Sequence, residues 1–141
     1  KKTADRENEK AETAQLLVPY AERDRGQVSG SISGAVFEVK TDVSYPLAFG
    51  TGGHYYTLKN SSGRYAYLKN GVNAGVIPSV QYHRSGFVGH KARSASKEAL
   101  AFGVEHRGRG QVVYFVDNPV FRGFWESGKL LLNNAVFLVG Q

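Results

Sequence analysis

The sequence predicts an α/β domain, with a mixed sheet of short strands and a long C-terminal helix. Two observations support this fold class. From residue 27 onward, short runs rich in β-branched and aromatic residues alternate with glycine-containing turns, which is typical of strands. The last of these runs leads, at Asp117-Asn118-Pro119, into an amphipathic segment. A buried strand that runs directly into a helix indicates α/β architecture.

The first 26 residues differ from the rest, and we expect a helical or partly disordered lead-in over 1–26 and the α/β domain over 27–141. Ala11, Ala14, Leu17 and Val18 share one short helical face. Pro19 should end or kink a helix at that point. Because the chain opens on lysine rather than methionine, we also expect it to be a processed or excised piece of a longer protein.

Six apolar runs are predicted as strands on their composition and their bounding turns. They are 35–40, 55–59, 65–69, 72–77, 99–105 and 111–116. Asn60-Ser61-Ser62-Gly63 has turn chemistry, so the second and third runs should form a hairpin. The last run is continuously apolar, which is expected of a strand covered on both faces. Residues 46–50 should be a loop or turn, and 85–97 a loop or the start of a short helix near 94–99.

The clearest helix signal follows the last strand. Asp117 or Asn118 should cap the helix, with Pro119 as its first residue, where no backbone donor is needed. Apolar residues then recur at spacings of three and four as far as residue 138. Trp125 should be buried against 112–116. Arg122, which is unfavourable near a helix N-terminus, should pair with Asp117 or Glu126.

Composition excludes several kinds of chemistry. The chain has no cysteine, so disulfides, thiolate zinc sites and cysteine nucleophiles are excluded. No apolar run approaches the roughly 18 residues of a membrane span. The four histidines have no partner at a metal-ligand spacing. We therefore expect no catalytic residue, metal site or cofactor in this chain itself.

Charge and aromatic content suggest two kinds of partner. The net charge is +6, and basic residues gather between Arg84 and Arg109. Such a stretch can bind phosphate backbones, but a solvated loop face, or a face that meets an acidic partner domain, is the commoner explanation, so nucleic acid is disfavoured. A peptide- or glycan-binding surface is the other possibility, and its candidate residues are tyrosines that could also alternate into the core. They are Tyr55, Tyr56, Tyr65 and Tyr67.

The C-terminal part resembles a known family. The similarity lies mainly in the stretch 102–125, above all in Asp117-Asn118-Pro119 with Phe121-Arg122 and Trp125. It extends to 129–137 and to three earlier segments, 32–37, 45–50 and 55–59. These segments are similar to the C-terminal glutamine-amidotransferase-like region of zinc carboxypeptidases from Bacteroidetes-type bacteria, relatives of carboxypeptidase A. The resemblance covers most of residues 28–140.

The resemblance implies a flavodoxin-like α/β fragment that follows a secreted zinc peptidase domain. It implies that the catalytic peptidase domain of the same polypeptide is the partner, that zinc lies in that domain, and that the parent is periplasmic or extracellular. The family's zinc motif, His-x-x-Glu with a distant His, has no matching positions here, and neither has the amidotransferase cysteine. The function expected is a non-catalytic accessory domain, with Asp117, Asn118, Arg122 and Trp125 as structural or interface residues.

Overall fold

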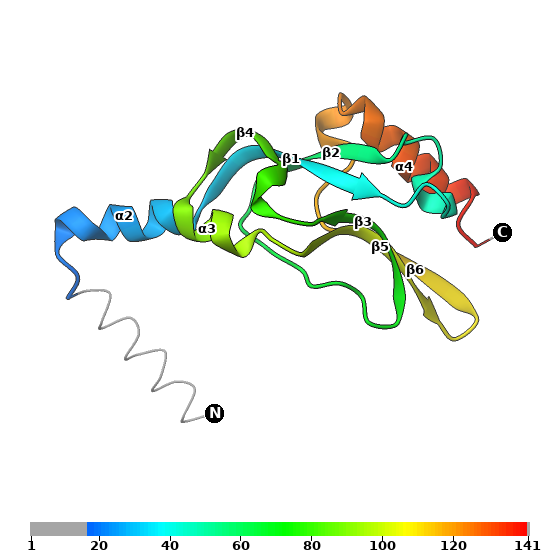
Figure 1. Cartoon of the computed structure of the whole chain (residues 1–141), viewed down its shortest axis with the longest axis horizontal. Coiled ribbons are helices and arrows are strands. Elements are labelled where there is room, and N and C mark those ends of the chain that lie inside the picture. The colour runs from blue at the N-terminus through cyan, green and yellow to red at the C-terminus, as the bar shows by residue number, and fades with distance from the viewer. Residues whose placement is uncertain (1–16, 141) are drawn as a thin grey trace.

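The computed structural model describes residues 17–140. Its centre is a curled six-stranded sheet, with two helices at one end and the C-terminal helix at the other (Figure 1). The strands are β1 (Ile32–Thr41), β2 (His54–Lys59), β3 (Gly71–Ile77), β4 (His83–Val88), β5 (Ala99–Arg107) and β6 (Gly110–Phe115). The helices are α2 (Tyr20–Gly30), α3 (His90–Ala95) and α4 (Glu126–Phe137).

The strand order is β2-β1-β3-β5-β6, with β4 pairing to β1 as well. The pairs are antiparallel, from the β1–β2 ladder to the β5–β6 hairpin. Strand β1 is long enough to serve two partners on one side, because β4 pairs with its first half and β3 with its last two residues. The ladder with β4 is irregular after Ser33, where Gly34 and Gly86 both have positive φ. Only glycine adopts that conformation readily.

The core lies on the concave side of the sheet, where alternate residues of β1 point inward. Phe37 and Val39 are fully buried there, and Phe102 of β5 joins them. A short 3-10 turn, Pro46–Ala48, adds Leu47, and α4 adds Leu131. Asn134 of α4 fixes this packing because its Nδ2 donates to the Leu47 and Phe49 carbonyls, at 3.1 and 2.8 Å.

The α/β class and the C-terminal helix are confirmed, and so are strands over five of the six predicted runs. A flavodoxin-like sheet is mostly parallel, whereas this one is built from antiparallel pairs. The difference follows from the connections. Adjacent strands such as β5 and β6 are joined by a tight turn, and a tight turn can join only antiparallel strands.

Three local predictions were wrong. The run 65–69 is not a strand: the Tyr65 carbonyl accepts from Leu100 N–H, and the Leu68 backbone is held by the Asn73 side-chain amide. A strand, β4, occupies part of the region expected to be a loop. Strand β6 is not covered on both faces, because it is an edge strand whose first three residues are exposed. The longest buried run lies in its neighbour β5, where residues 99–104 are all buried.

The start of the C-terminal helix also differs from expectation. The C-terminal helix begins at Glu126 rather than Pro119, because Arg122 and Gly123 both have positive φ and interrupt it. Pro19 immediately precedes α2, and the helix that it was expected to end or kink falls mostly outside the described residues. Helix α2 runs from residue 20 to 30 and so spans the boundary expected after residue 26, while the rest of the predicted lead-in, residues 1–16, lies outside the described residues.

Candidate functional site

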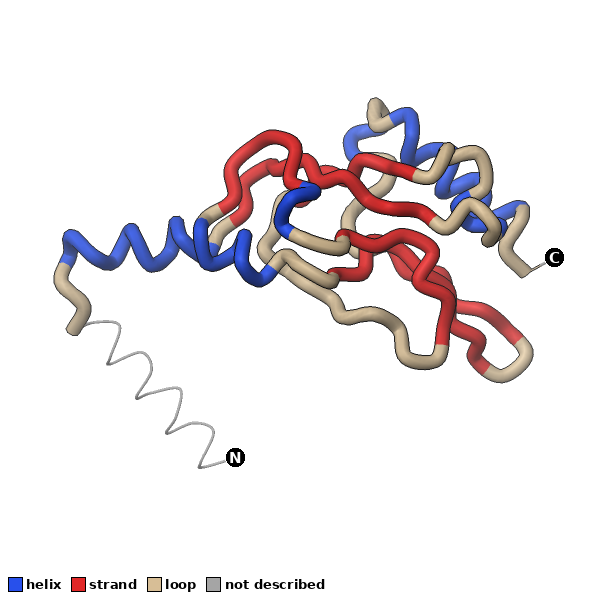
Figure 2. Tube along the Cα trace, in the orientation of Figure 1, coloured by secondary structure: helices blue, strands red, loops and turns tan. Residues whose placement is uncertain are grey.

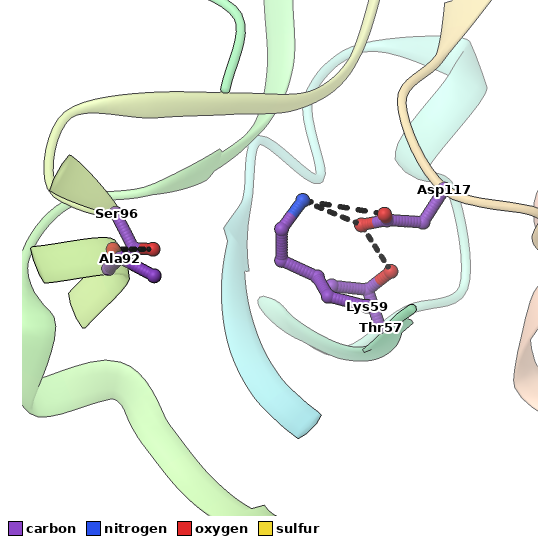
Figure 3. A network of polar contacts seen from close by, with 5 residues as sticks. All are labelled: Thr57, Lys59, Ala92, Ser96 and Asp117. Carbon is purple, nitrogen blue, oxygen red and sulfur yellow. Dashed lines mark hydrogen bonds and ion pairs between the residues drawn. The ribbon is translucent and has the colours of Figure 1, made fainter. Parts of the chain in front are cut away.

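A buried ion pair joins β2 to the segment that follows β6. The Lys59 Nζ lies 3.2 Å from Asp117 Oδ1, and Thr57 Oγ1 donates to Asp117 Oδ2 at 3.1 Å (Figure 3). The Lys59 and Asp117 side chains are only 6% and 8% exposed. We call Tyr55, Thr57, Lys59 and Asp117 the buried polar cluster.

Strand alternation explains how the cluster forms. Tyr55, Thr57 and Lys59 are two residues apart, so they share one face of β2, and that face is the buried one. Asp117 comes two residues after β6 ends, where the chain leaves the sheet and crosses toward β2. A lysine that is forced inside by its register needs an anionic partner, because an unpaired buried charge is strongly destabilising.

Burial dominates the electrostatics of the cluster. It raises the pKa of Asp117 above its ordinary value, and the Lys59 charge and the hydrogen bonds from Lys59 and Thr57 offset this only in part. Burial, with the nearby Asp117 charge adding to it, also raises the pKa of Tyr55 to about 12. The cluster therefore favours a neutral phenol at Tyr55, while the Lys59 charge favours the ionised form of Asp117.

The raised Tyr55 pKa predicts an alkaline loss of stability. Between the ordinary tyrosine pKa of 10.0 and about 12, the folded state holds a proton that the unfolded state has released. The free energy of unfolding should therefore fall as pH rises through this window. Urea unfolding across the window should show the fall in the parent and a smaller one in Tyr55→Phe. An equal fall in both proteins would contradict the assignment.

The four residues predicted at the Asp117 corner are not gathered into one site. Asp117 does not cap a helix but pairs with Lys59, and Asn118 Oδ1 accepts from Val120 N–H in a local turn. The Arg122 guanidinium lies over the Phe121 ring, 5.2 Å from its centre, and is exposed rather than paired with Asp117. Arg122 has positive φ, so the short 3-10 turn Phe121–Gly123 is kinked at this residue.

Trp125 is half-buried rather than packed on the β6 strand as predicted. Its Nε1 donates to the Tyr56 carbonyl at 2.8 Å, so the indole lies at β2. Together with the Lys59–Asp117 pair, this bond fastens the segment 117–125 to β2 at two points.

The four tyrosines are divided between core and surface. Tyr55 is 5% exposed and packs edge-on against Phe102, whereas Tyr56, Tyr65 and Tyr67 are exposed. Tyr56 lies on β2 beside His54, while the other two lie in the loop between β2 and β3. Of the four tyrosines predicted as possible binding residues, strand alternation therefore places only Tyr55 in the core, and the other three are exposed.

An open apolar hollow of about 390 Å³ lies where α4 meets the turn after β1. Phe49 is 65% exposed and Leu138 39% exposed at its wall. We call the residues that line it the C-terminal apolar surface: Val43, Ser44, Tyr45, Pro46, Phe49 and Leu138. The segments 43–53 and 130–141 that supply these residues contain no charged side chain. Exposed apolar surface of this kind commonly marks an interaction site.

The basic residues of 84–109 are spread over three elements. Arg84 on β4 pairs with Glu38, Lys91 and Arg93 lie on α3, and Arg107 pairs with Glu105 near the β5–β6 turn. Within 17–140, no three histidine or acidic side chains are placed to hold a metal ion. In the same part of the chain, no helix is both long and apolar enough to cross a bilayer.

The site could be predicted only in part. Lys59 and Thr57 were not singled out, although the alternation of 55–59 places both on the Tyr55 side of the strand. Comparisons with protein-family models, curated proteins and solved structures found no match to this chain.

Proposed function

We propose that this chain is a non-catalytic accessory domain of a secreted zinc carboxypeptidase, and that it packs against the catalytic peptidase domain of the same polypeptide. The observation that supports the proposal is the C-terminal apolar surface. Apolar side chains exposed around one hollow, as Phe49 and Leu138 are here, commonly mark an interaction site. The sequence resemblance over 28–140 supplies the identity of that partner.

The lack of charge in this surface favours a protein partner over the alternatives. A nucleic acid or an anionic membrane would be met by lysine and arginine, and neither lies in 43–53 or 130–141. The core of a permanent interface between domains is depleted in charge and enriched in aromatic residues, as Tyr45 and Phe49 are here. The hydrogen bonds from Asn134 to the Leu47 and Phe49 carbonyls hold the lining turn in place.

The buried polar cluster has a structural role in this proposal. Each of its charges is satisfied inside the chain, and none of its members lines the apolar hollow. Lys59 and Asp117 thus hold the segment before α4 on the sheet, which in turn positions α4 and Leu138, the residue that follows the helix.

An activity assay tests the non-catalytic part of the proposal. The purified 141-residue chain, with zinc added, is incubated with peptides that carry a free C-terminal residue. We expect release of that residue to equal a blank without protein. Zinc-dependent turnover well above the blank, abolished by a chelator, would show that the chain has its own catalytic site and would remove the proposal.

A further inference from the structure

The outer edge of β6 has free hydrogen-bonding groups, and the register shows which ones. Val116 N–H donates to the Ala101 carbonyl at 2.9 Å, just beyond the β5–β6 ladder. In an antiparallel pair, directly bonded residues alternate with unbonded ones. Tyr114 and Val112 therefore bond inward to β5. The N–H and C=O groups that point away from the sheet belong to Gln111, Val113 and Phe115.

The opposite edge of the sheet, formed by β2, is blocked by a side chain. There Thr41 N–H donates to the Gly53 carbonyl, so by the same alternation the outward groups of β2 include those of Tyr56. The Tyr56 carbonyl accepts the indole N–H of Trp125, so a side chain blocks this edge. Within 17–140, nothing donates to or accepts from the outward backbone groups of Gln111, Val113 and Phe115.

Strand β6 also lacks the usual protection of a free edge. Edge strands are commonly blunted by a charged residue, a proline or a bulge. The stretch 110–115 has neither a charged residue nor a proline, and its ladder with β5 is regular. The hairpin projects from the body of the sheet, so the edge is open to an approaching chain (Figure 2).

We propose that the outer edge of β6 binds an extended peptide by strand addition, and that the peptide carries an acidic group at the end that lies beside the hairpin turn. Peptides bind free sheet edges in this way, with the backbone giving affinity and alternate side chains giving specificity. This inference goes beyond the accessory-domain proposal and does not depend on it, because every group involved lies in this chain.

Charge at the hairpin turn carries the preference for an acidic group. Arg107 is the last residue of β5 and Arg109 lies in the turn itself, and the Arg107 side chain is 67% exposed. Glu105 partly neutralises Arg107, at 3.3 Å. Within the described residues Arg109 has no recorded ion pair, so it is the cation available to a bound carboxylate.

The side chains of β6 indicate the rest of the peptide. Val113 and Phe115 pack toward the core, and Phe115 contacts the Phe102 ring. Val112, on the other face, is 38% exposed. An added strand would place its own alternate side chains beside these residues, so β-branched residues along the peptide would extend the existing cross-strand packing.

Proline substitution at one residue tests the edge directly. Val113→Pro removes an N–H that points away from β5, and proline is tolerated at such an edge position. The probe is a labelled short peptide of alternating threonine and valine that ends in two glutamates, measured by fluorescence anisotropy with the whole chain. We expect saturable binding to the parent, and binding about tenfold or more weaker to Val113→Pro. Circular dichroism and a thermal melt establish that the variant is folded.

Arg109→Gln and a second peptide test the charge preference. The second peptide ends in two lysines instead of two glutamates. We expect the parent to prefer the acidic peptide by several-fold, and Arg109→Gln to lose this preference while still binding both peptides. Equal binding by the parent and a folded Val113→Pro would overturn the edge site. The absence of binding between the parent and either peptide would also overturn it. A parent that sediments as a dimer, with Val113→Pro sedimenting as a monomer, would overturn it as well, because the edge would then pair with a second copy of the chain.

Discussion

Substituting Lys59 alone with methionine should lower the free energy of unfolding by about 3–5 kcal/mol, because it leaves the Asp117 carboxylate buried without its cation. The double variant Lys59→Met/Asp117→Leu should recover most of this loss. A buried pair often contributes little net stability, since removing two charges from water offsets their attraction. The raised pKa of Asp117 supports this expectation, because the effect of burial on that pKa is larger than the opposing effects of the Lys59 charge and the hydrogen bonds from Lys59 and Thr57. Urea unfolding of both single variants and the double variant measures these differences.

The Lys59→Met variant should also depend on pH in a defined direction. Without Lys59, the pKa of Asp117 should rise further above its unfolded value. Between those two values the folded state binds a proton that the unfolded state does not, so stability decreases as pH rises through the window. The variant should therefore be closest to the parent in mild acid. An equal loss of unfolding free energy at acid and neutral pH would contradict a structural ion pair. So would a double variant whose loss equals the sum of the losses in the two single variants.

Replacing Gly128 with alanine should be strongly destabilising, against the usual effect of this substitution in a helix. An alanine inside a helix normally stabilises by up to about 1 kcal/mol relative to glycine. At Gly128 an added Cβ would overlap the carbonyl oxygen of Pro119, and it is a backbone atom that has to move. Overpacking of this kind costs about 1–3 kcal/mol or more. Helix α4 would be displaced from the sheet, and Leu131 with it.

A second helical glycine gives the matched control. Gly26 lies inside α2, and an added Cβ there meets nothing within 4 Å. Gly26→Ala should therefore leave stability unchanged or raise it slightly, while Gly128→Ala lowers the urea midpoint clearly. If both variants unfold like the parent, α4 does not lie against Pro119 as described.

The sequence predicted the sheet better than it predicted the helix. Runs such as 55–59 and 99–105 have a period-two or continuous apolar pattern, and that pattern depends only on which face is buried. The start of the last helix depends instead on the backbone at Arg122, which adopts positive φ although it is not glycine. Local capping rules applied at Asp117-Asn118-Pro119 could not foresee that Asp117 is required by Lys59, 58 residues away in the chain.

The remaining errors also come from tertiary context. Strand β6 is as apolar as a covered strand, but it lies at the edge of the sheet. The order of strands in a sheet cannot be inferred from the local sequence pattern of one strand. Lys59 has the same alternation as Tyr55 and Thr57, so its burial could have been inferred from the strand register alone. A lysine at an inward position is a signal to search for a distant acid.

The coding sequence upstream of the Lys1 codon tests most directly the proposal that this chain is an accessory domain of a zinc carboxypeptidase. We expect one continuous reading frame that encodes a peptidase domain with a His-x-x-Glu motif and a more distant histidine as its zinc ligands. A reading frame that lacks this motif, or a different domain in that place, would contradict the claim.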